Sequence, residues 1–144
     1  MKKLLTACLL IILCGCKNSS EEKNEETARV EFSPEMKESI SRGAQVYNNF
    51  CASCHLSGGE GIKAVFPPLQ NSNWLKDKQE ASIHAIKFGL RGPIKVNGEE
   101  YDNLMPALGL SDREIADVMN YINNSWGNRV SDEVTEEEVA AIKK

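Results

Sequence analysis

The amino-acid sequence predicts an all-α fold for residues 34–128, with a small β-hairpin inserted in it. Two observations predict this fold class. Apolar residues recur at every third or fourth position in several segments, as they do along one face of a helix. Extended runs are short, and they flank Asn97–Gly98, a dipeptide typical of a tight hairpin turn. The chain of 144 residues has room for one such domain with appended segments.

The first helix is predicted to begin after Ser33. A serine is a good N-cap, and Pro34 suits the first helical position. The apolar face that follows consists of Met36, Ile40, Gly43, Tyr47 and Phe50. This face leads into the segment "CASCH", residues 51–55, so the helix is expected to end at that cluster.

Two later segments of the domain also carry helix signals. The pattern "DKQE" is typical of a capping box, which predicts a second helix that begins at Asp77 and ends at Gly89. The pattern "SDRE" predicts a third helix that begins at Ser111 and stops at Gly127. The apolar face of the second helix comprises Ile83, Ile86 and Leu90, and that of the third comprises Ile115, Val118, Met119, Ile122 and Trp126.

A tail, residues 129–144, follows the domain and is predicted to contain a last short helix. Thr135 and Glu138 have the spacing of a capping box. Val134 and Val139 have the spacing of a hydrophobic staple across the same helix start. The start of this helix is therefore the best defined part of the tail.

The first residues predict an exported lipoprotein. "MKK" is positively charged, and the apolar run of residues 4–13 is shorter than the ~20 residues that a membrane span needs, so residues 1–15 have the pattern of a secretory signal. The segment "LCGC" resembles a bacterial lipobox, in which Cys16 would become the lipid-carrying N-terminus. An ordinary signal peptide followed by a chance cysteine is the alternative. Residues 16–33 are polar and are expected to form a disordered tether to a bacterial membrane.

Charge and cysteine usage narrow the function classes. Removal of the signal leaves 15 basic residues against 21 acidic ones, a net charge of −6, and the acidic residues are spread along the chain. This balance gives no indication of nucleic-acid binding. Only Cys51 and Cys54 remain in the folded part, which is expected to be exported to a compartment where thiols do not stay reduced by default.

Three chemistries use a cluster such as "CASCH". A structural zinc site needs four ligands, and His84 would have to complete it as a lone histidine without the usual paired spacing. A redox dithiol normally follows a strand in a βαβ unit, whereas this sequence predicts helices. Covalent attachment of haem needs two thiols at fixed spacing and an adjacent histidine. Cys51, Cys54 and His55 provide all three, so the sequence favours one covalent haem c.

An iron bound by His55 needs a ligand on its other face. Met36 and Met119 lie on apolar helical stripes, where methionine usually fills the core, and His84 is interpreted as a structural residue. Met105 instead lies in a predicted loop, and Pro106 after it keeps that loop out of a helix and stiffens it. Met105 is therefore the predicted sixth ligand.

From about Ser33 to Asn128, the chain resembles the class I monohaem cytochromes c. The resemblance is carried by Gly43 and Tyr47 ahead of the haem motif, by Val118 and Tyr121 in the last helix of the domain, and by Pro67 and Leu69 in "FPPLQ", with Pro68 as a possible substitute. The stretches "FPPLQNSNWL", "GLRGPIKVNGEEYDNLMPALGLSDREI" and "NSWGN" are similar to a bacterial subgroup of small carriers and cytochrome subunits of respiratory enzymes. The hairpin and the tail depart from the minimal family pattern.

The resemblance implies helices wrapped around one haem and a Pro67 carbonyl that accepts a hydrogen bond from His55. The charged propionates of a haem also need donors, which Trp74, Arg91 and Tyr101 offer, and Trp74 and Arg91 are the preferred candidates. The expected function is one-electron transfer between respiratory redox proteins, by a monomer or a subunit of a complex, without enzymatic activity of its own. A haem enzyme or gas sensor that loses Met105 is the alternative. The segment "SGGEG", residues 57–61, is expected to be only a flexible turn.

Overall fold

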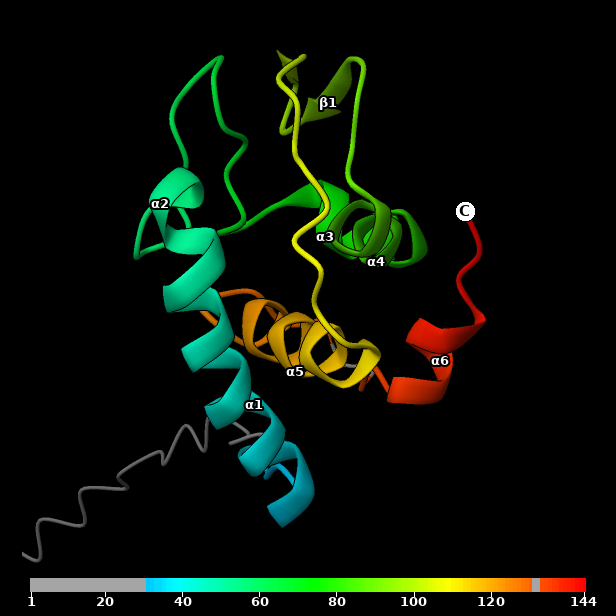
Figure 1. Cartoon of the computed structure of the whole chain (residues 1–144). Coiled ribbons are helices and arrows are strands. Elements are labelled where there is room, and N and C mark those ends of the chain that lie inside the picture. The colour runs from blue at the N-terminus through cyan, green and yellow to red at the C-terminus, as the bar shows by residue number, and fades with distance from the viewer. Residues whose placement is uncertain (1–30, 131–132) are drawn as a thin grey trace, which may run out of the picture. The chain divides into compact units, whose positions relative to one another are not determined.

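The computed structural model describes residues 31–130 and 133–144. They form a mostly helical domain with a small two-stranded hairpin, as the sequence predicts (Figure 1). The predicted signal peptide, Cys16 and most of the predicted tether lie outside the described residues. None of the helices in the described ranges has both the length and the apolar character that a membrane span requires.

The first helical segment is continuous, but it changes from α-helical to π-helical hydrogen bonding and back. Helix α1 (Pro34–Val46) begins as predicted, since the Ser33 side chain accepts a hydrogen bond from the amide of Met36 at 3.1 Å. A π-helical turn, η1 (Tyr47–Cys51), and a last α-helical turn, α2 (Ala52–His55), follow. The π-turn contains one more residue per hydrogen-bonded ring, which rotates later positions. Phe50 is consequently 42% exposed, although the sequence pattern placed it on the buried face.

The second helical region contains two helices rather than one. Helix α3 (Asn73–Asp77) was not predicted, and α4 (Gln79–Phe88) begins two residues later than expected. Asp77 therefore ends α3 instead of capping α4, and this prediction was wrong. The reason is a competing cap, because the Ser72 side chain accepts a hydrogen bond from the amide of Leu75 at 3.5 Å and starts α3. Gly89 ends α4 as predicted, with a φ of +84°.

The hairpin lies where the sequence predicts it. Strands β1 (Ile94–Val96) and β2 (Glu99–Tyr101) pair antiparallel. The turn residues Asn97 and Gly98 have φ values of +50° and +87°, as a tight two-residue hairpin turn requires. The hairpin is attached to α3, because Asn97 exchanges two hydrogen bonds with Asn73, at 2.7 and 3.0 Å.

Helix α5 (Asp112–Asn123) has the predicted capping box, formed by Ser111 and Glu114. It ends before the predicted stop at Gly127. Trp126 has a φ of +51° and lies in the following loop, so its predicted place on the helical stripe was wrong.

Helix α6 (Glu136–Ala141) forms in the tail as predicted. The Thr135 side chain accepts a hydrogen bond from the Glu138 amide at 3.2 Å and caps the helix. Val134 and Val139 are both buried. The tail therefore adds two apolar side chains to the core instead of lying free beside it.

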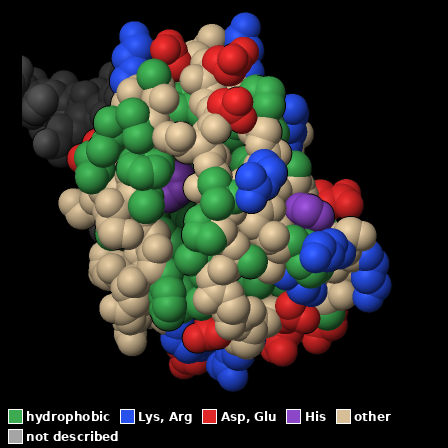
Figure 2. Space-filling model, turned by 45° about the horizontal axis from the view of Figure 1, so that its top comes forward, with side chains coloured by type: hydrophobic (Ala, Val, Ile, Leu, Met, Phe, Trp, Pro, Cys, Tyr) green, Lys and Arg blue, Asp and Glu red, His purple; other side chains and the backbone are tan. Residues whose placement is uncertain are grey.

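Part of the apolar surface stays uncovered. Figure 2 shows hydrophobic side chains gathered on one face of the molecule around a histidine side chain. Among the described residues, the exposed large apolar side chains besides Phe50 are Ile62, Val65 and Leu104, at 43%, 38% and 56% exposure. Apolar side chains gathered on a surface indicate a binding site for a ligand or a partner more often than a packing defect.

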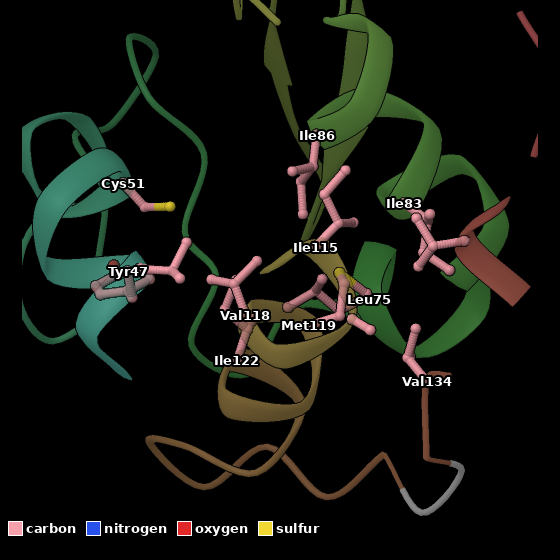
Figure 3. Packing of buried hydrophobic residues seen from close by; sticks show 13 residues of the cluster. Tyr47, Cys51, Leu75, Ile83, Ile86, Ile115, Val118, Met119, Ile122 and Val134 are labelled. Carbon is pink, nitrogen blue, oxygen red and sulfur yellow. The ribbon is translucent and has the colours of Figure 1, made fainter. Parts of the chain in front are cut away.

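The core is built where α1 crosses α5. Gly43 allows the close approach, because a Cβ there would overlap the backbone of Asp117 and the Cβ of Tyr121. Val118 is fully buried, and the rings of Tyr121 and Tyr47 lie 5.4 Å apart. Figure 3 shows side chains from α5, from η1 and from the α3–α4 region meeting in one apolar cluster.

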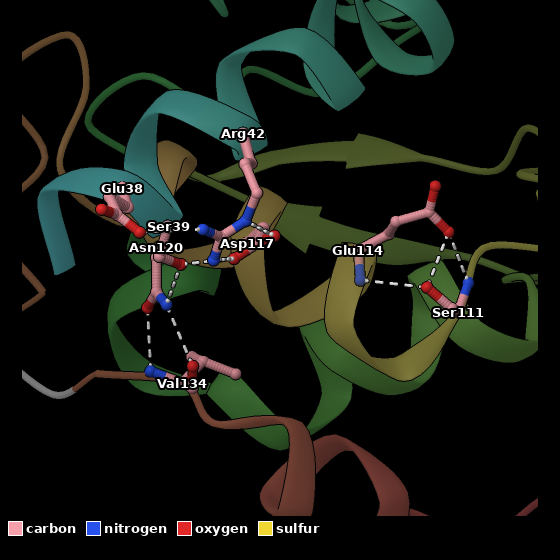
Figure 4. Close-up of polar contacts among 8 residues, drawn as sticks. All are labelled: Glu38, Ser39, Arg42, Ser111, Glu114, Asp117, Asn120 and Val134. Carbon is pink, nitrogen blue, oxygen red and sulfur yellow. Dashed lines mark hydrogen bonds and ion pairs between the residues drawn. The ribbon is translucent and has the colours of Figure 1, made fainter. Parts of the chain in front are cut away.

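A polar network closes the same crossing (Figure 4). Asp117 is 5% exposed and accepts two hydrogen bonds from Arg42 and one from Ser39, all at 2.7 Å. Asn120 donates to Ser39 and exchanges two further hydrogen bonds with the backbone of Val134. Buried polar groups are tolerated when each has partners, so this network fixes α1, α5 and the tail in one arrangement.

Candidate functional site

The "CASCH" cluster forms the last turns of the first helical segment. Cys51 ends the π-turn and is buried, whereas Cys54 is half-buried, and no disulfide joins the two. His55 is the last helical residue. The chain reverses at Leu56, whose φ is +62°, and the Tyr47 hydroxyl donates to the Leu56 carbonyl at 2.6 Å. The helix and this hydrogen bond thus fix the point at which the histidine projects.

His55 is held as a neutral imidazole with one nitrogen available. Its side chain is 9% exposed, and its Nδ1 lies 2.9 Å from the carbonyl oxygen of Pro67. A carbonyl can only accept, so Nδ1 donates, and in the neutral ring Nε2 then carries the lone pair. Burial lowers the pKa of His55, against a smaller opposing effect of the Pro67 hydrogen bond. The ring is therefore in the form that binds a metal.

The segment 57–61 supports this arrangement and is not merely a turn. The Gly59 carbonyl accepts hydrogen bonds from the amides of Leu69 and Gln70 at 2.7 and 2.9 Å. Gly61 has a φ of +63°, and a Cβ at this position would overlap the carbonyl groups of Phe66 and Pro67. The backbone here packs directly beneath the group that accepts the His55 hydrogen bond, which requires glycine.

Met105 is fixed by a different part of the chain. It forms an isolated antiparallel bridge with Leu90, through backbone hydrogen bonds of 2.8 and 3.0 Å. Gly89 lies so close that a Cβ on it would touch the Met105 carbonyl at 2.9 Å. The side chain of Asn103 also donates to the Val65 carbonyl at 2.8 Å. Sequence analysis missed the pairing with Leu90, and the only available signal was the glycine before it.

Two adjacent pockets bring these segments together. The two pockets share part of their lining, so they lie side by side in the domain. His55 and Met105 line both pockets, whereas Cys51 lines the first and Cys54 the second. The residues that line both are His55, Pro67, Leu90, Ile94 and Met105. The rest of the first pocket's wall is mostly apolar, including Leu75, Ile86, Val96 and Ile122.

The other predicted site residues divide into two groups. Leu69 and Trp74 line the first pocket, and so does Pro68. Arg91 is exposed and lines neither pocket, although it directly follows Leu90. His84 also lies outside both pockets, and its ring packs edge-on against Phe88 at 5.0 Å.

The other two methionines considered as iron ligands, Met36 and Met119, are core residues. Met36 is buried at the start of α1 and does not line either pocket. Met119 contributes to the first pocket but is fully buried in the α5 core. Among the described residues, no group of three or more histidine, cysteine or acidic side chains has the geometry of a metal site. The zinc alternative, with His84 as a ligand, thus has no support from the geometry.

The family model for cytochrome c matches residues 40–126. This chain belongs to the cytochrome c family. Its cofactor is therefore covalent haem c, and Cys51 and Cys54 stand in the attachment motif. The residues present fit this group, since two thiols, an imidazole and a thioether border two adjoining pockets with mostly apolar walls.

Several curated proteins are similar to this cytochrome c. Cytochrome c-552 of Thermus thermophilus is 38% identical over 91 residues, which cover 60% of this chain and 69% of that protein. The gluconate 2-dehydrogenase cytochrome c subunit of Pantoea cypripedii is 36% identical over 106 residues, 71% of this chain but 24% of the subunit. The cytochrome c subunit of the alcohol dehydrogenase (quinone) of Gluconobacter oxydans is 33% identical over 104 residues, 70% of this chain and 22% of the subunit.

Proposed function

We propose that this cytochrome c is a one-electron carrier, anchored to a bacterial membrane, in which His55 and Met105 are the two axial ligands of the iron. The observation that carries the proposal is that these two side chains come from separate segments and line the same two apolar pockets. Haem c supplies a one-electron iron couple when it is bound. Similar proteins include both a cytochrome c-552 and dehydrogenase subunits, so the role is that of a shuttle or a cytochrome subunit.

The protein's residues set how readily the iron changes oxidation state. The Pro67 carbonyl fixes the tautomer of His55 and raises its basicity as a ligand. The thioether of Met105 is a soft, neutral ligand that favours the ferrous state and raises the reduction potential. Burial of the pocket acts in the same direction. If His55 and Met105 both held the iron, no position would be left for dioxygen or peroxide, whereas a haem enzyme or sensor would require displacement of Met105.

Trp74 and Arg91 remain the proposed donors to the haem propionates. Trp74 lines the first pocket, and its indole N–H is a hydrogen-bond donor. Arg91 is exposed and directly follows Leu90, which lines both pockets. Both side chains can donate to a carboxylate, so substitution of each is expected to alter the potential without removing haem.

The exposed apolar residues indicate where a redox partner approaches. Val65 and Leu104 line the second pocket, and Ile62 lies in the same loop as Val65. A partner that contacts them comes close to the pocket that Cys54 borders. Electron transfer needs such proximity but not a large or permanent interface, which suits a weak complex.

Substitution of Met105 tests the ligand assignment. Met105→Ala should give a ferric protein that binds cyanide or imidazole quickly and lacks the weak red absorption of sulfur ligation. Met105→His should stay low-spin but lower the reduction potential by about 0.1 V or more, within the ~0.8 V range that axial ligands span. His84→Ala is the control and should change neither property. If His84→Ala loses the parent spectrum while Met105→Ala keeps it, the iron has two histidine ligands.

Membrane attachment rests on the segment "LCGC" alone and has its own test. Cys16→Ser should move the protein from the membrane to the soluble exported fraction with an unchanged haem spectrum. Cys14→Ser, which keeps a small residue before the cleavage site, is the matched control and should stay membrane-bound. Retention of Cys16→Ser on membranes after a salt wash would contradict lipidation at this residue.

A further inference from the structure

The C-terminal tail packs on the domain although it lies outside the segment that matches the family, residues 40–126. Val134 and Val139 are 1% and 0% exposed, and Ile142 packs against the same apolar cluster. Helix α6 contacts α5, and side chains of α4 reach its backbone and its first turn. The tail therefore packs against α4 and α5, two helices that lie within the matched segment.

Lys87 is the junction between the tail and the domain. Its ammonium group donates to the backbone carbonyl of Val139 at 2.7 Å and forms an ion pair with Asp112 at 2.9 Å. The Lys87 side chain is only 18% exposed and that of Asp112 is 32% exposed. The contacts join three elements at one point, namely the end of α4, the start of α5 and the last turn of α6.

The loop that carries Met105, residues 102–111, is attached to two of the elements that Lys87 joins. Leu90, which pairs with the backbone of Met105, follows Lys87 by three residues. Asp112 is the first residue of α5, the helix into which the Met105 loop runs. Figure 1 shows this loop, in yellow, passing α4 and entering α5, with α6 close to both helices. A separation of α4 from α5 would therefore change the span that the loop has to bridge.

We propose that Lys87 is a positioning residue for the sixth ligand, and that the tail supplies one of the groups that hold it. The inference rests on the proposed role of Met105 as an iron ligand. The ammonium of Lys87 neutralises the Asp112 carboxylate and satisfies the Val139 carbonyl in a mostly desolvated position. Without it, those two groups draw toward water, and the end of α4 loses this polar contact with α5, although the apolar packing between the helices stays. The bridge between Leu90 and Met105 then opens more often.

Gln79 provides a matched control at the opposite end of the same helix. Its side chain donates to Glu138 at 3.2 Å, so it also attaches the tail to α4. Gln79 is eleven residues before Leu90 in the chain, and it contacts neither Asp112 nor the Met105 loop through any hydrogen bond among the described residues. If the tail only stabilised the fold, loss of either contact would lower the unfolding midpoint, and neither loss would change the rate of ligand binding.

The experiment compares holoprotein variants in the ferric state. The measurements are the rate of imidazole binding, the red absorption band of sulfur ligation, and the midpoint of denaturant unfolding. Lys87→Met, which keeps the apolar stem, is expected to bind imidazole about tenfold faster or more, because hydrogen bonds to charged groups are among the stronger ones. It should also show a weakened sulfur band. Gln79→Leu should keep the parent rate and band, and Lys87→Arg should restore most of both.

The results that would overturn the proposal are equally defined. Equal imidazole rates for Lys87→Met and Gln79→Leu, at whatever loss of stability, would show that Lys87 has only a structural role. If Lys87→Met does not yield holoprotein, Asp112→Asn replaces it, with the same faster binding expected and the parent rate as the contrary result. The Met105→Ala variant distinguishes failure of this inference from failure of the proposed function. If that variant binds imidazole quickly and Lys87→Met does not, this inference fails while the proposed function stands; if Met105→Ala is itself unchanged, the proposed function fails.

Discussion

The two sides of the haem site are held by contacts of different range. On the His55 side, the hydrogen bond to Pro67 spans 12 residues, and Gly61 donates to the His55 carbonyl only six residues away. On the Met105 side, the backbone bridge joins Met105 to Leu90, beyond the whole hairpin, and the Asn103 side chain reaches Val65 across 38 residues. A single short loop thus fixes the histidine, whereas the methionine depends on the relative placement of several elements.

This difference predicts which side is rigid and which is adjustable. Local contacts form whenever the helix and its following loop form, so the histidine is positioned almost as soon as the motif is folded. A loop that few buried contacts hold can open locally at lower free-energy cost than the core. The Met105 side is therefore where variants are expected to tune the potential or admit an external ligand.

The largest effect is expected from removal of the group that both sides share. Cys51→Ala with Cys54→Ala should leave apoprotein that is largely unfolded, because a small domain with two apolar pockets at its centre relies on the haem as part of its core. Far-ultraviolet circular dichroism and denaturant titration measure this. Cys54→Ala alone keeps one attachment point and should stay folded when it carries haem. A cooperative unfolding transition in the haem-free double variant would contradict the prediction.

The same contrast explains what the sequence could predict. The spacing of "CASCH", the Ser33 and Ser111 caps and the Asn97–Gly98 turn are local signals, and the structure has the helices and the hairpin that they predict. The Leu90–Met105 bridge joins residues with no sequence pattern in common, so only the folded chain reveals it.

Errors in the prediction arose where two local signals competed. Ser72 and Asp77 both have the chemistry of a helix cap, and the choice between them depends on how α3 packs. The π-turn that exposes Phe50 inserts a residue into an otherwise regular helical pattern, which an apolar period cannot reveal. Arg91 was chosen as a propionate donor for its chemistry alone, and it lines neither pocket, so that assignment stays a prediction.

An intermediate effect is expected from Gly61→Ala on the His55 side. Gly92 is the control, because it also has a positive φ, +92°, but nothing lies within 4 Å of a Cβ placed there. Gly92→Ala should cost about 1–2 kcal/mol of unfolding free energy from backbone conformation alone. Gly61→Ala should cost about 1–3 kcal/mol more, because its Cβ overlaps the backbone that carries the Pro67 carbonyl.

The Gly61 variant also has a signature that stability alone does not give. A displaced Pro67 carbonyl weakens the hydrogen bond to His55, which makes the imidazole a less basic ligand and disfavours the ferric state. The reduction potential should therefore rise in Gly61→Ala and stay at the parent value in Gly92→Ala. Potentiometric titration of both holoproteins measures it. Equal potentials in the two variants would show that the loop beneath Pro67 does not position the acceptor.

The smallest effect is expected where the two sides are joined to each other. Asn103 is exposed, and its amide donates to the Val65 carbonyl, which links the Met105 loop to the loop that follows His55. Asn103→Ala should cost about 0.5–1.5 kcal/mol at most, since water can replace the lost donor at this exposed carbonyl. The potential should not change, because Leu90 still holds Met105 and Pro67 still holds His55. Denaturant unfolding and potentiometry on the holoprotein measure the two quantities. A loss of stability as large as that of Gly61→Ala, together with a shifted potential, would mean that the two sides form one cooperative unit, and the distinction between a rigid histidine side and an adjustable methionine side would have to be abandoned.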